Sequence, residues 1–392
     1  MVQVILKKNE HKNVVKGFPW IYYNEIDKII GEYEPGDIVD ILDSSKSFIG
    51  RGYINPKSKI TVRVLTRKDE EINKDFFYRR ILQAWEYRKK VVDTSSCRVV
   101  FAEADFLPGL IIDKFEDIFV IQTLTLGIDR FKDVIVDVLN EIFNPRGIYE
   151  RNDVSVREIE GLPLQKGFLK GNFDTKILIM ENDVNILVDV ENGQKTGYFL
   201  DQRENRAMLK NIVNNAEVLD AFCYTGSFAI HACKYGAQKV TAVDISSDAL
   251  EIAKENAKIN SYEDKIEFIE KNVFDLLREY HKEKRQFDVV ILDPPAFTKS
   301  QKTVADALRG YKEINLRAMK ILREGGFLIT CSCSQHITRE LFEQVIESAS
   351  EDANRILRLV DFRTQAKDHP ILLSYPESYY LKCAIYQVLK KD

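Results

Sequence analysis

The sequence predicts a three-part chain whose last part is an α/β domain with a mostly parallel sheet. From about residue 185 onward, short apolar and β-branched segments alternate with helical segments, which is typical of a doubly wound parallel sheet. The first 68 residues contain short β-type runs separated by turn residues, which favours a small β-barrel. The 392 residues suffice for two to three domains with their own cores. We expect domains at 1–68, 69–184 and 185–392.

The expected barrel combines strand patterns with positive charge. Glu34-Pro-Gly-Asp37 predicts a turn, and the expected strands around it are VQVIL, IVDIL, FIGRGYI and ITVRVL. Twelve basic and eight acidic residues lie in this segment, although the whole chain has a net charge of -4. The excess indicates either a basic face for an anionic partner or an ordinary solvated surface, and charge alone does not decide between them.

The middle segment, residues 69–184, predicts an α+β domain. Apolar residues recur at helical spacing over Ile72–Val92. The strands LIIDKF and IFVIQTL, a second helix near 129–143 and a strand at GIYE follow. No catalytic constellation stands out in this segment, so we expect the chemistry in the last domain.

Composition excludes several classes of protein. With 45% hydrophobic and 30% charged residues, the chain is not largely disordered. No apolar run reaches the roughly 18 residues that a membrane span needs, and the first residues lack the apolar core of a signal peptide. Six cysteines and five histidines show no zinc-site spacing, so we expect no metal. These observations predict a cytoplasmic protein with no membrane partner.

Two acids end the first two strands of the α/β domain. Asp220 precedes a turn with Gly226 that opens a helix, and the next strand ends in Asp244, whose carboxylate can accept hydrogen bonds from ribose hydroxyls. The G-x-G-x-x-G that holds a pyrophosphate is absent, and an acid near the turn would repel one. The pattern therefore favours S-adenosylmethionine (SAM), a cationic ligand without phosphate, over NAD. Alternatively, either acid simply caps a helix.

Two further strand ends carry candidate residues. Asn272 follows the third strand and can hydrogen-bond adenine, although Asn is also a common turn residue. The next strand ends in Asp293 followed by two prolines, which lock a rigid turn at the carboxyl edge of the sheet. There Asp293 can hydrogen-bond a base edge, and Phe297 can stack on a flipped base as an exposed aromatic.

Two cysteines follow the next strand, in Thr330-Cys-Ser-Cys-Ser334. On an extended backbone Cys331 and Cys333 point the same way, so one can act as a nucleophile while the other packs. A polar, glycine-bearing segment at 193–206 is expected to cover a ligand, or else forms an ordinary surface helix.

Together these segments resemble the class I SAM-dependent 23S rRNA (cytosine-5) methyltransferases of large-subunit type I, which carry an N-terminal PUA domain. The resemblance spans nearly the whole chain. It rests on GQKTGYFLDQR, LDAFCYTGSFAIHA, VDIS, DPPAF and SCS in this order, with Asp368-His-Pro370 and Tyr380-Leu-Lys382 in the tail. It implies an RNA-binding PUA β-barrel, a central α+β domain, and a Rossmann-like domain with a mostly parallel seven-stranded sheet.

The resemblance also implies residue roles. Because this chain has Pro295-Ala296 where other cytosine-5 RNA methyltransferases have Pro-Cys, the SCS motif would supply the nucleophile. Relatives keep the second Cys of this motif more reliably, so Cys333 would be the nucleophile, with Cys331 as the alternate. Asp293 would act on the base, beside the substrate-binding Pro294, Pro295 and Phe297. The cofactor would contact Asp293 and the residues Asp220, Tyr224, Thr225, Gly226, Asp244, Asn272, Val273, Gln202 and Arg203.

The activity implied is formation of 5-methylcytosine in large-subunit rRNA, with SAM as methyl donor and a covalent bond from Cys to C6 of the base. One alternative is an RNA N-methyltransferase that uses Asp-Pro-Pro on a guanine or adenine amine. Another is a non-catalytic RNA-binding factor, and an NAD-dependent oxidoreductase is more distant still. The sequence leaves the oligomeric state open, a homodimer included.

Overall fold

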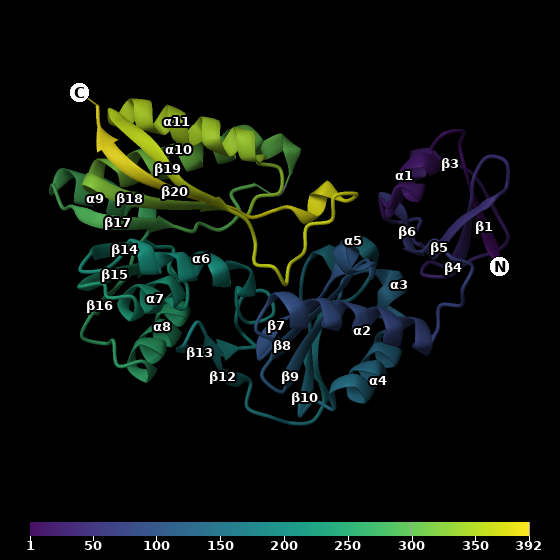
Figure 1. Cartoon of the computed structure of the whole chain (residues 1–392). Coiled ribbons are helices and arrows are strands. Elements are labelled where there is room, and N and C mark those ends of the chain that lie inside the picture. The colour runs from purple at the N-terminus through teal and green to yellow at the C-terminus, as the bar shows by residue number, and fades with distance from the viewer. Residues whose placement is uncertain (299, 392) are drawn as a thin grey trace. The chain divides into compact units, whose positions relative to one another are not determined.

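The structure is a computed structural model that describes residues 1–298 and 300–391 (Figure 1). Contacts divide the chain into two compact units, and each is described by itself below. The first unit comprises Met1–Ile179, Val188–Leu200 and Lys367–Ser378, and the second comprises Met180–Leu187, Asp201–Ala366 and Tyr379–Asp392. The boundaries 1–68, 69–184 and 185–392 stay a prediction.

A six-stranded sheet in the order β2-β6-β5-β4-β1-β3 opens the first unit. β1 and β4 are parallel and the other neighbours antiparallel, around buried aliphatic side chains such as Val4, Val39 and Val62. The four predicted strands are present. The sequence did not reveal α1, β2 and β3, because all three are short and β3 faces mostly solvent. The bounds are β1 (Val2–Leu6), α1 (His11–Val15), β2 (Trp20–Tyr22), β3 (Ile26–Ile30), β4 (Ile38–Leu42), β5 (Phe48–Ile54) and β6 (Ile60–Thr66).

A five-stranded sheet in the order β11-β10-β9-β8-β7 forms the rest of the first unit's core. Only β9 and β10 are parallel among its neighbours, and α2 and α4 pack together over its apolar side chains. The helix expected near 129–143 is interrupted at Phe131, which precedes α4 in a non-helical conformation. The bounds are α2 (Lys74–Val91), β7 (Ser96–Phe101), β8 (Leu110–Phe115), β9 (Ile118–Thr123), α3 (Leu126–Asp129), α4 (Lys132–Phe143), β10 (Gly147–Asn152), α5 (Val156–Glu160) and β11 (Gln165–Lys170).

A buried ion pair joins β6 of the first sheet to α5, which lies between β10 and β11 in the chain. Arg63 of β6 donates through Nη2 to Oε1 of Glu160 at 2.7 Å, and both side chains are almost completely buried. Asn55 donates to the other carboxylate oxygen of Glu160 at 2.9 Å. A buried pair of this kind makes each partner necessary to the other, because either charge alone would be desolvated without compensation.

The second unit is built on a seven-stranded sheet in the order β16-β15-β14-β17-β18-β20-β19. Its first five strands are parallel, and β20 is antiparallel to both β18 and β19. The predicted mostly parallel sheet is therefore confirmed. The strands are β14 (Glu217–Ala221), β15 (Lys239–Asp244), β16 (Ile266–Glu270), β17 (Phe287–Leu292), β18 (Leu322–Ser332), β19 (Arg355–Arg363) and β20 (Lys382–Lys390), and the hairpin β12 (Lys176–Glu181) with β13 (Val184–Asp189) precedes them.

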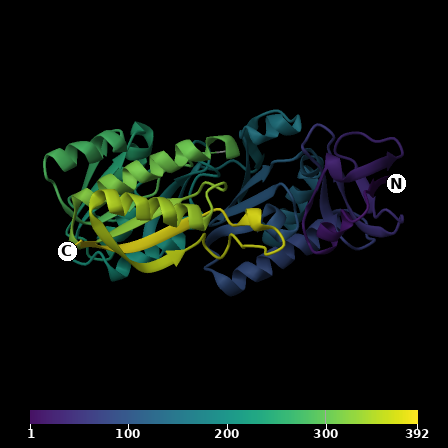
Figure 2. The same cartoon turned by 90° about the horizontal axis from the view of Figure 1, so that it is seen from above.

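Helices cover both faces of the seven-stranded sheet. α7 and α8 pack on β14, β15 and β16, whereas α10 packs on β17 and β18 and lies beside α9 and α11. In Figures 1 and 2, α10 and α11 run side by side along the strands at the C-terminal part of the sheet. The helices are α6 (Arg203–Ala207), α7 (Ser227–Lys234), α8 (Ser247–Ile259), α9 (Val273–Lys282), α10 (Val304–Ile321) and α11 (Arg339–Ala353).

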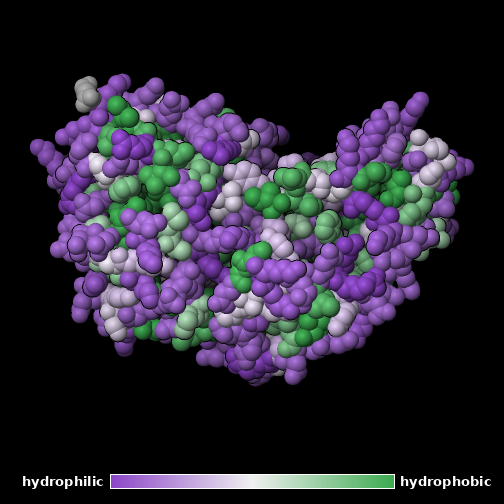
Figure 3. Space-filling model, in the orientation of Figure 1, coloured by the Kyte–Doolittle hydropathy of each residue, from purple (hydrophilic) through white to green (hydrophobic). Residues whose placement is uncertain are grey.

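The surface is mostly hydrophilic on the face drawn in Figure 3, with apolar patches scattered between charged regions. Within residues 1–298 and 300–391, none of the helices has the length and apolar character required to span a bilayer.

Candidate functional site

The predicted acids lie at the carboxyl edge of the seven-stranded sheet. β14 sits between β15 and β17, so the chain progresses outward in both directions from it, and ligands of open α/β sheets bind at such a switch point. Asp220 is the penultimate residue of β14, Asp244 ends β15, and Asp293 directly follows β17. The backbone N–H of Asp293 approaches the carbonyl of Ala221 at 3.5 Å, so Asp293 is adjacent to the end of β14.

The turn after β14 has an unusual backbone. Phe222, Tyr224 and Gly226 all have positive φ, at 67°, 50° and 77°. Only glycine adopts this conformation without steric cost, and strained residues of this kind concentrate where a structure clamps a ligand. The turn then enters α7, whose first residue is Ser227. The sequence indicated Gly226 but carried no sign that two aromatic residues share its conformation.

Asp220 has a strongly perturbed carboxyl group. It is completely buried, its Oδ2 accepts a hydrogen bond from the Ala229 N–H at 3.0 Å, and its Oδ1 has no hydrogen-bond partner. Burial, with the nearby charge of Asp293 and then of Asp244, raises the pKa of Asp220 to about 8. A buried carboxylate oxygen without a donor is suited to a cationic ligand, whose charge would stabilise the ionised form.

Asp244 stabilises the same turn. Its Oδ2 accepts from the Tyr224 N–H at 2.9 Å and its Oδ1 accepts from the Ser246 N–H at 3.0 Å. Ser246, and not Asp244, caps α8, because the Ser246 hydroxyl accepts from the N–H of Ala249. The helix-capping alternative is therefore wrong for Asp244. Each of its oxygens retains a lone pair that can accept from a ligand hydroxyl.

Thr225 and Asn272 present further polar groups. The Thr225 hydroxyl is buried without a hydrogen-bond partner, while its carbonyl accepts from Asn256 at 3.0 Å. Asn272 caps α9, its side-chain oxygen accepting from the Phe274 N–H at 2.9 Å, and Val273 begins that helix. The side-chain oxygen of Asn272 therefore has the local structural role that the sequence left open as an alternative. Its amide N–H groups can still donate to a ring nitrogen of adenine.

Gln202 connects the segment before β14 with the Asp-Pro-Pro turn. Its side-chain N–H donates to Oδ1 of Asp293 at 2.9 Å, and its oxygen accepts from Asn205 at 2.6 Å. Arg203, in contrast, lies 3.7 Å from the carboxylate of Glu181 and contributes with Arg206 to the charge around that buried group. The structure therefore gives Gln202 a place beside Asp293 and gives Arg203 an ion pair elsewhere.

The two cysteines have different surroundings. Cys331 is fully buried in β18 opposite Cys383 of β20, and contact with that thiol together with burial raises its pKa well above the ordinary value. Cys333 lies beyond the end of β18 and is partly exposed, with its Sγ 4.0 Å from the carbonyl oxygen of Pro294. Reactive thiols are accessible and near positive charge, so the geometry favours Cys333 over Cys331.

Lys382 supplies positive charge at this turn. Its buried ammonium group donates to the carbonyls of Ser334 and Tyr380 at 2.8 and 2.7 Å. Burial lowers the pKa of Lys382 to about 8, while the Cys333 thiolate acts in the opposite direction. The sequence singled out this residue only as the end of the Tyr380-Leu-Lys382 motif. Its position follows from β20 pairing with β18, where Ser332 faces Lys382.

The sequence predicts Phe297 as an exposed aromatic residue, and the structure corrects this prediction. It is half-buried, its ring lies 4.7 Å from that of Tyr311 and 6.0 Å from that of Phe274, and it packs against the sheet's core. Pro294 is buried and Pro295 exposed in the same turn. Of these residues, Pro295 is the most accessible to a substrate, and Phe297 can offer only the part of its ring that packing leaves free.

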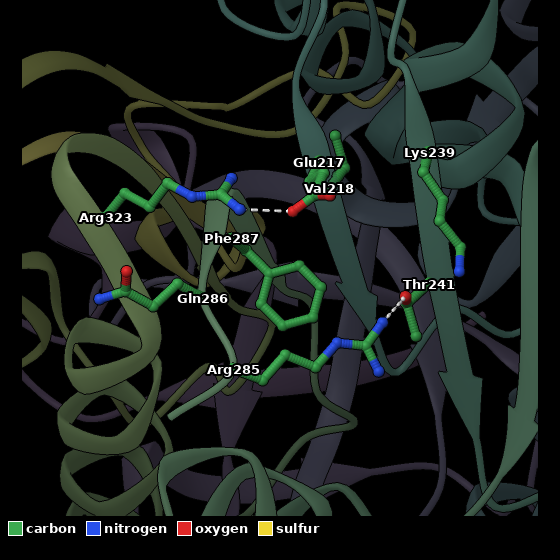
Figure 4. A pocket seen from close by; sticks show the side chains of 8 residues that line it. All are labelled: Glu217, Val218, Lys239, Thr241, Arg285, Gln286, Phe287 and Arg323. Atoms are coloured by element: carbon green, nitrogen blue, oxygen red, sulfur yellow. Dashed lines mark hydrogen bonds and ion pairs between the residues drawn. The ribbon is translucent and has the colours of Figure 1, made fainter. Parts of the chain in front are cut away.

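A separate pocket of about 310 Å³ lies at the opposite, amino-terminal edge of the sheet (Figure 4). The Phe287 ring lies between two arginines there, Arg285 and Arg323. Arg323 contacts Glu217 and Asp288, and Arg285 donates to the Thr241 hydroxyl at 3.0 Å. Because its charges are compensated and it lies away from the three acids, we do not assign it to the candidate site.

Family models and curated relatives match this arrangement. Residues 165–370 match the model described as S-adenosylmethionine-dependent methyltransferase, and residues 4–67 match a PUA-like domain. The Ribosomal RNA large subunit methyltransferase I of Alteromonas mediterranea is 41% identical over 391 residues, with 98% of each chain covered. That of Aliivibrio fischeri is 42% identical over 387 residues, covering 97% of this chain and 98% of its own. This chain belongs to the ribosomal RNA large subunit methyltransferase I family. Its predicted family, PUA-like segment and SAM-dependent methyltransferase class are thereby confirmed.

Solved structures share the fold along the full length. A Streptococcus mutans protein assigned as a SAM-dependent methyltransferase aligns with a TM-score of 0.84 at 21% identity, covering 99% of this chain and 100% of its own. A second protein, crystallised with S-adenosylhomocysteine, aligns with a TM-score of 0.85 at 21% identity and the same coverage.

The residues at the carboxyl edge fit the family's cofactor. SAM carries an ammonium and a sulfonium group, and the unpartnered oxygen of Asp220 offers a buried acceptor for positive charge. The hydroxyl of Thr225 lacks a partner in the same turn, and Asp244 ends the neighbouring strand, where ribose hydroxyls bind in related folds.

Proposed function

We propose that this SAM-dependent methyltransferase modifies carbon 5 of a cytosine in large-subunit rRNA. The curated relatives are named as large-subunit rRNA methyltransferases, which supports the substrate class. The observation that carries the chemistry is the accessible thiol of Cys333 beside the Asp293-Pro-Pro turn, with the ammonium of Lys382 nearby.

Different residues of the candidate site would contact different parts of the cofactor. Asp220, with Tyr224, Thr225 and Gly226, would hold the methionine end, and Asp244 would accept from the ribose hydroxyls. Asn272 and Val273 would contact adenine. Bound SAM supplies an activated methyl group on its sulfonium. Gln202 positions the carboxyl group of Asp293 through its 2.9 Å hydrogen bond.

The chain's own groups perform the remaining chemistry on the base. C5 of cytosine is a weak nucleophile, so the Cys333 thiolate adds to C6, forming an S–C6 bond and placing electron density on C5. In its protonated form Asp293 would donate to N3 and accept from the N4 amine, which stabilises the negative charge that develops on N3. C5 accepts the methyl group, loses its proton to a base or water, and the S–C6 bond breaks to restore the thiolate and the ring. The base must first leave its stack, which favours a loop or partly unfolded RNA.

The deciding experiment compares Cys333→Ser with Cys331→Ser. Large-subunit rRNA is incubated with each variant and labelled SAM, and the modified nucleosides are identified by mass spectrometry. We expect label on 5-methylcytosine for the wild type and Cys331→Ser, and none for Cys333→Ser with SAM binding retained. Full activity of Cys333→Ser, or label on a guanine or adenine amine, would refute the cytosine-5 mechanism and support the N-methyltransferase alternative.

The PUA-like segment supports backbone binding to RNA. Its excess of basic residues predicts an affinity that falls steeply with salt, as counterions are released from the RNA. The cytoplasmic location and the homodimer stay predictions, and light scattering on the purified chain tests the latter.

A further inference from the structure

A second pocket, of about 210 Å³, lies within the first unit beside α2. Arg80, Gln83, Ala84 and Tyr87 line it from one stripe of that helix, at the spacing that places side chains on a common face. The opposite wall comes from the segment around Phe106 and from Pro370. The pocket is smaller than the roughly 300–1,000 Å³ of sites for drug-sized ligands, and suits a single flat ring system.

Arg80 brings to this pocket a positive charge that has no direct ion pair. Among the described residues no carboxylate lies within ion-pair distance of it, and burial lowers its pKa against the weaker opposing effect of the Glu70 charge. Its guanidinium donates to the Leu65 carbonyl and lies 5.3 and 5.5 Å from the rings of Phe76 and Phe106. Arg67 nearby is likewise desolvated, and its guanidinium donates to the carbonyls of Val14 and Phe18.

The other poorly exposed arginines of the first unit differ from Arg80 and Arg67 in having a carboxylate partner. Each forms an ion pair with a carboxylate, as the pairs Arg51–Asp40, Arg63–Glu160, Arg88–Asp105, Arg98–Asp113 and Arg157–Asp129 show. Taking a charge from water without such compensation is costly. The two exceptions therefore point to an anion that comes from outside the chain.

The acid in the pocket wall does not provide that compensation. Both carboxylate oxygens of Asp105 accept from the fully buried Arg88, at 2.5 and 2.6 Å, and one also accepts from the Phe101 N–H. Its charge is thus balanced within the wall. The pocket keeps the positive charge of Arg80.

The walls also offer flat surfaces and a hydrogen-bonding amide. Tyr87 is 38% exposed, and Gln83 is exposed beside it. Phe106 has a φ of 59°, a conformation that a bulky residue adopts only when its surroundings impose it. Aromatic faces stack on nucleobases of any sequence, while an amide can read a base edge.

The Asp368-His-Pro370 motif holds the remaining wall in place. Asp368 accepts from the Arg98 N–H at 2.9 Å through its carboxylate and from Arg88 at 2.8 Å through its carbonyl. The His369 ring lies 2.8 Å from the Asp368 carboxylate through Nδ1 and packs on Phe101. These bonds place Pro370 at the pocket and give this tail motif a structural role in the first unit.

We propose that this pocket binds one nucleotide of the RNA substrate other than the methylated base. Its base lies against Tyr87 and Phe106 within reach of Gln83, and its phosphate pairs with Arg80. The proposal rests on the proposed function for its substrate class, but it is a binding site of the first unit and needs no part of the methyl-transfer chemistry.

The test uses the full chain and a large-subunit rRNA fragment that the wild type binds. Arg80→Gln and Tyr87→Ala are compared with the control Arg79→Gln, which removes the same charge from the next residue, an exposed arginine paired with Glu70. We expect RNA binding roughly 5- to 150-fold weaker for Tyr87→Ala, since stacking on one base contributes that much. Arg80→Gln should weaken it roughly 10- to 150-fold, because it removes a charge-assisted hydrogen bond to the phosphate. The KM for RNA should rise accordingly, with kcat and the Kd for SAM unchanged, and Arg79→Gln should stay close to wild type.

RNA affinity tests the pocket, and rRNA methylation by the wild type tests the proposed function. Wild-type RNA affinity in folded Arg80→Gln and Tyr87→Ala would overturn the pocket, even if the proposed methylation is confirmed. Absence of rRNA methylation by the wild type would refute the proposed function, whereas loss of RNA binding in the variants would still support the pocket. Should a variant misfold, photo-crosslinking of wild type to thiouridine-containing rRNA decides: we expect crosslinks within 80–87 or 101–107, and their absence refutes the site.

Discussion

The raised pKa of Asp220 makes a sharp prediction about how SAM binding depends on pH. With a pKa of about 8, this carboxyl group is protonated in most cofactor-free molecules at pH 7. A cationic ligand binds the ionised form, so the chain must release the proton first. Below about pH 7 the ionised fraction falls about tenfold for each pH unit, and apparent affinity falls with the fraction of competent molecules.

We therefore expect the apparent Kd for SAM to be about tenfold lower at pH 7 than at pH 6, with about one proton released per SAM bound. Calorimetry in two buffers of different ionisation enthalpy measures both quantities. Asp220→Asn keeps an acceptor for the Ala229 N–H but cannot ionise, so it should bind SAM weakly, without proton release and without this pH dependence.

The same group affects folding in the opposite direction. Its folded pKa lies above the ordinary 3.8, so the folded state holds a proton that the unfolded state loses, and stability falls as pH rises from about 4 towards 8. Between pH 6 and 7 the cofactor-free wild type should lose about 1 kcal/mol relative to Asp220→Asn. Wild-type SAM binding that is independent of pH between 6 and 7, with no proton release, would refute this reasoning.

Three further predictions follow from individual contacts. Asp244→Ala should weaken SAM binding about 10- to 100-fold by removing a charged hydrogen-bond acceptor, and calorimetry giving an unchanged Kd would contradict its ribose role. Lys382→Met should slow alkylation of Cys333 at pH 7 severalfold, as followed by peptide mass spectrometry, and an unchanged rate would show that the ammonium does not act on the thiol. Glu160→Gln should lower the free energy of unfolding by about 3–5 kcal/mol, because Arg63 would keep a buried charge without its partner; denaturation curves that coincide with wild type would show that solvent reaches this pair.

The residues at strand ends were predictable from local pattern. Asp220, Asp244 and Asp293 each follow an apolar β-branched run, and the carboxyl ends of parallel strands meet at one edge of a sheet. The order of strands and helices, and the mostly parallel sheet, were predicted for the same reason. Weakly patterned elements such as β3 were not, because a short strand that faces solvent leaves no apolar alternation.

The sequence by itself determined the fold class and the set of candidate side chains, because periodicity and strand-end position are local properties of the chain. Only the tertiary structure shows that Cys331 and Cys333 differ in accessibility: the first is buried against Cys383, which β20 brings beside β18 from far along the chain, and the second is partly exposed. Other contacts between segments distant in sequence raise the pKa of Asp220 and pair Arg203 with Glu181. Burial and electrostatic surroundings depend on which distant segments pack together, and no local pattern encodes them.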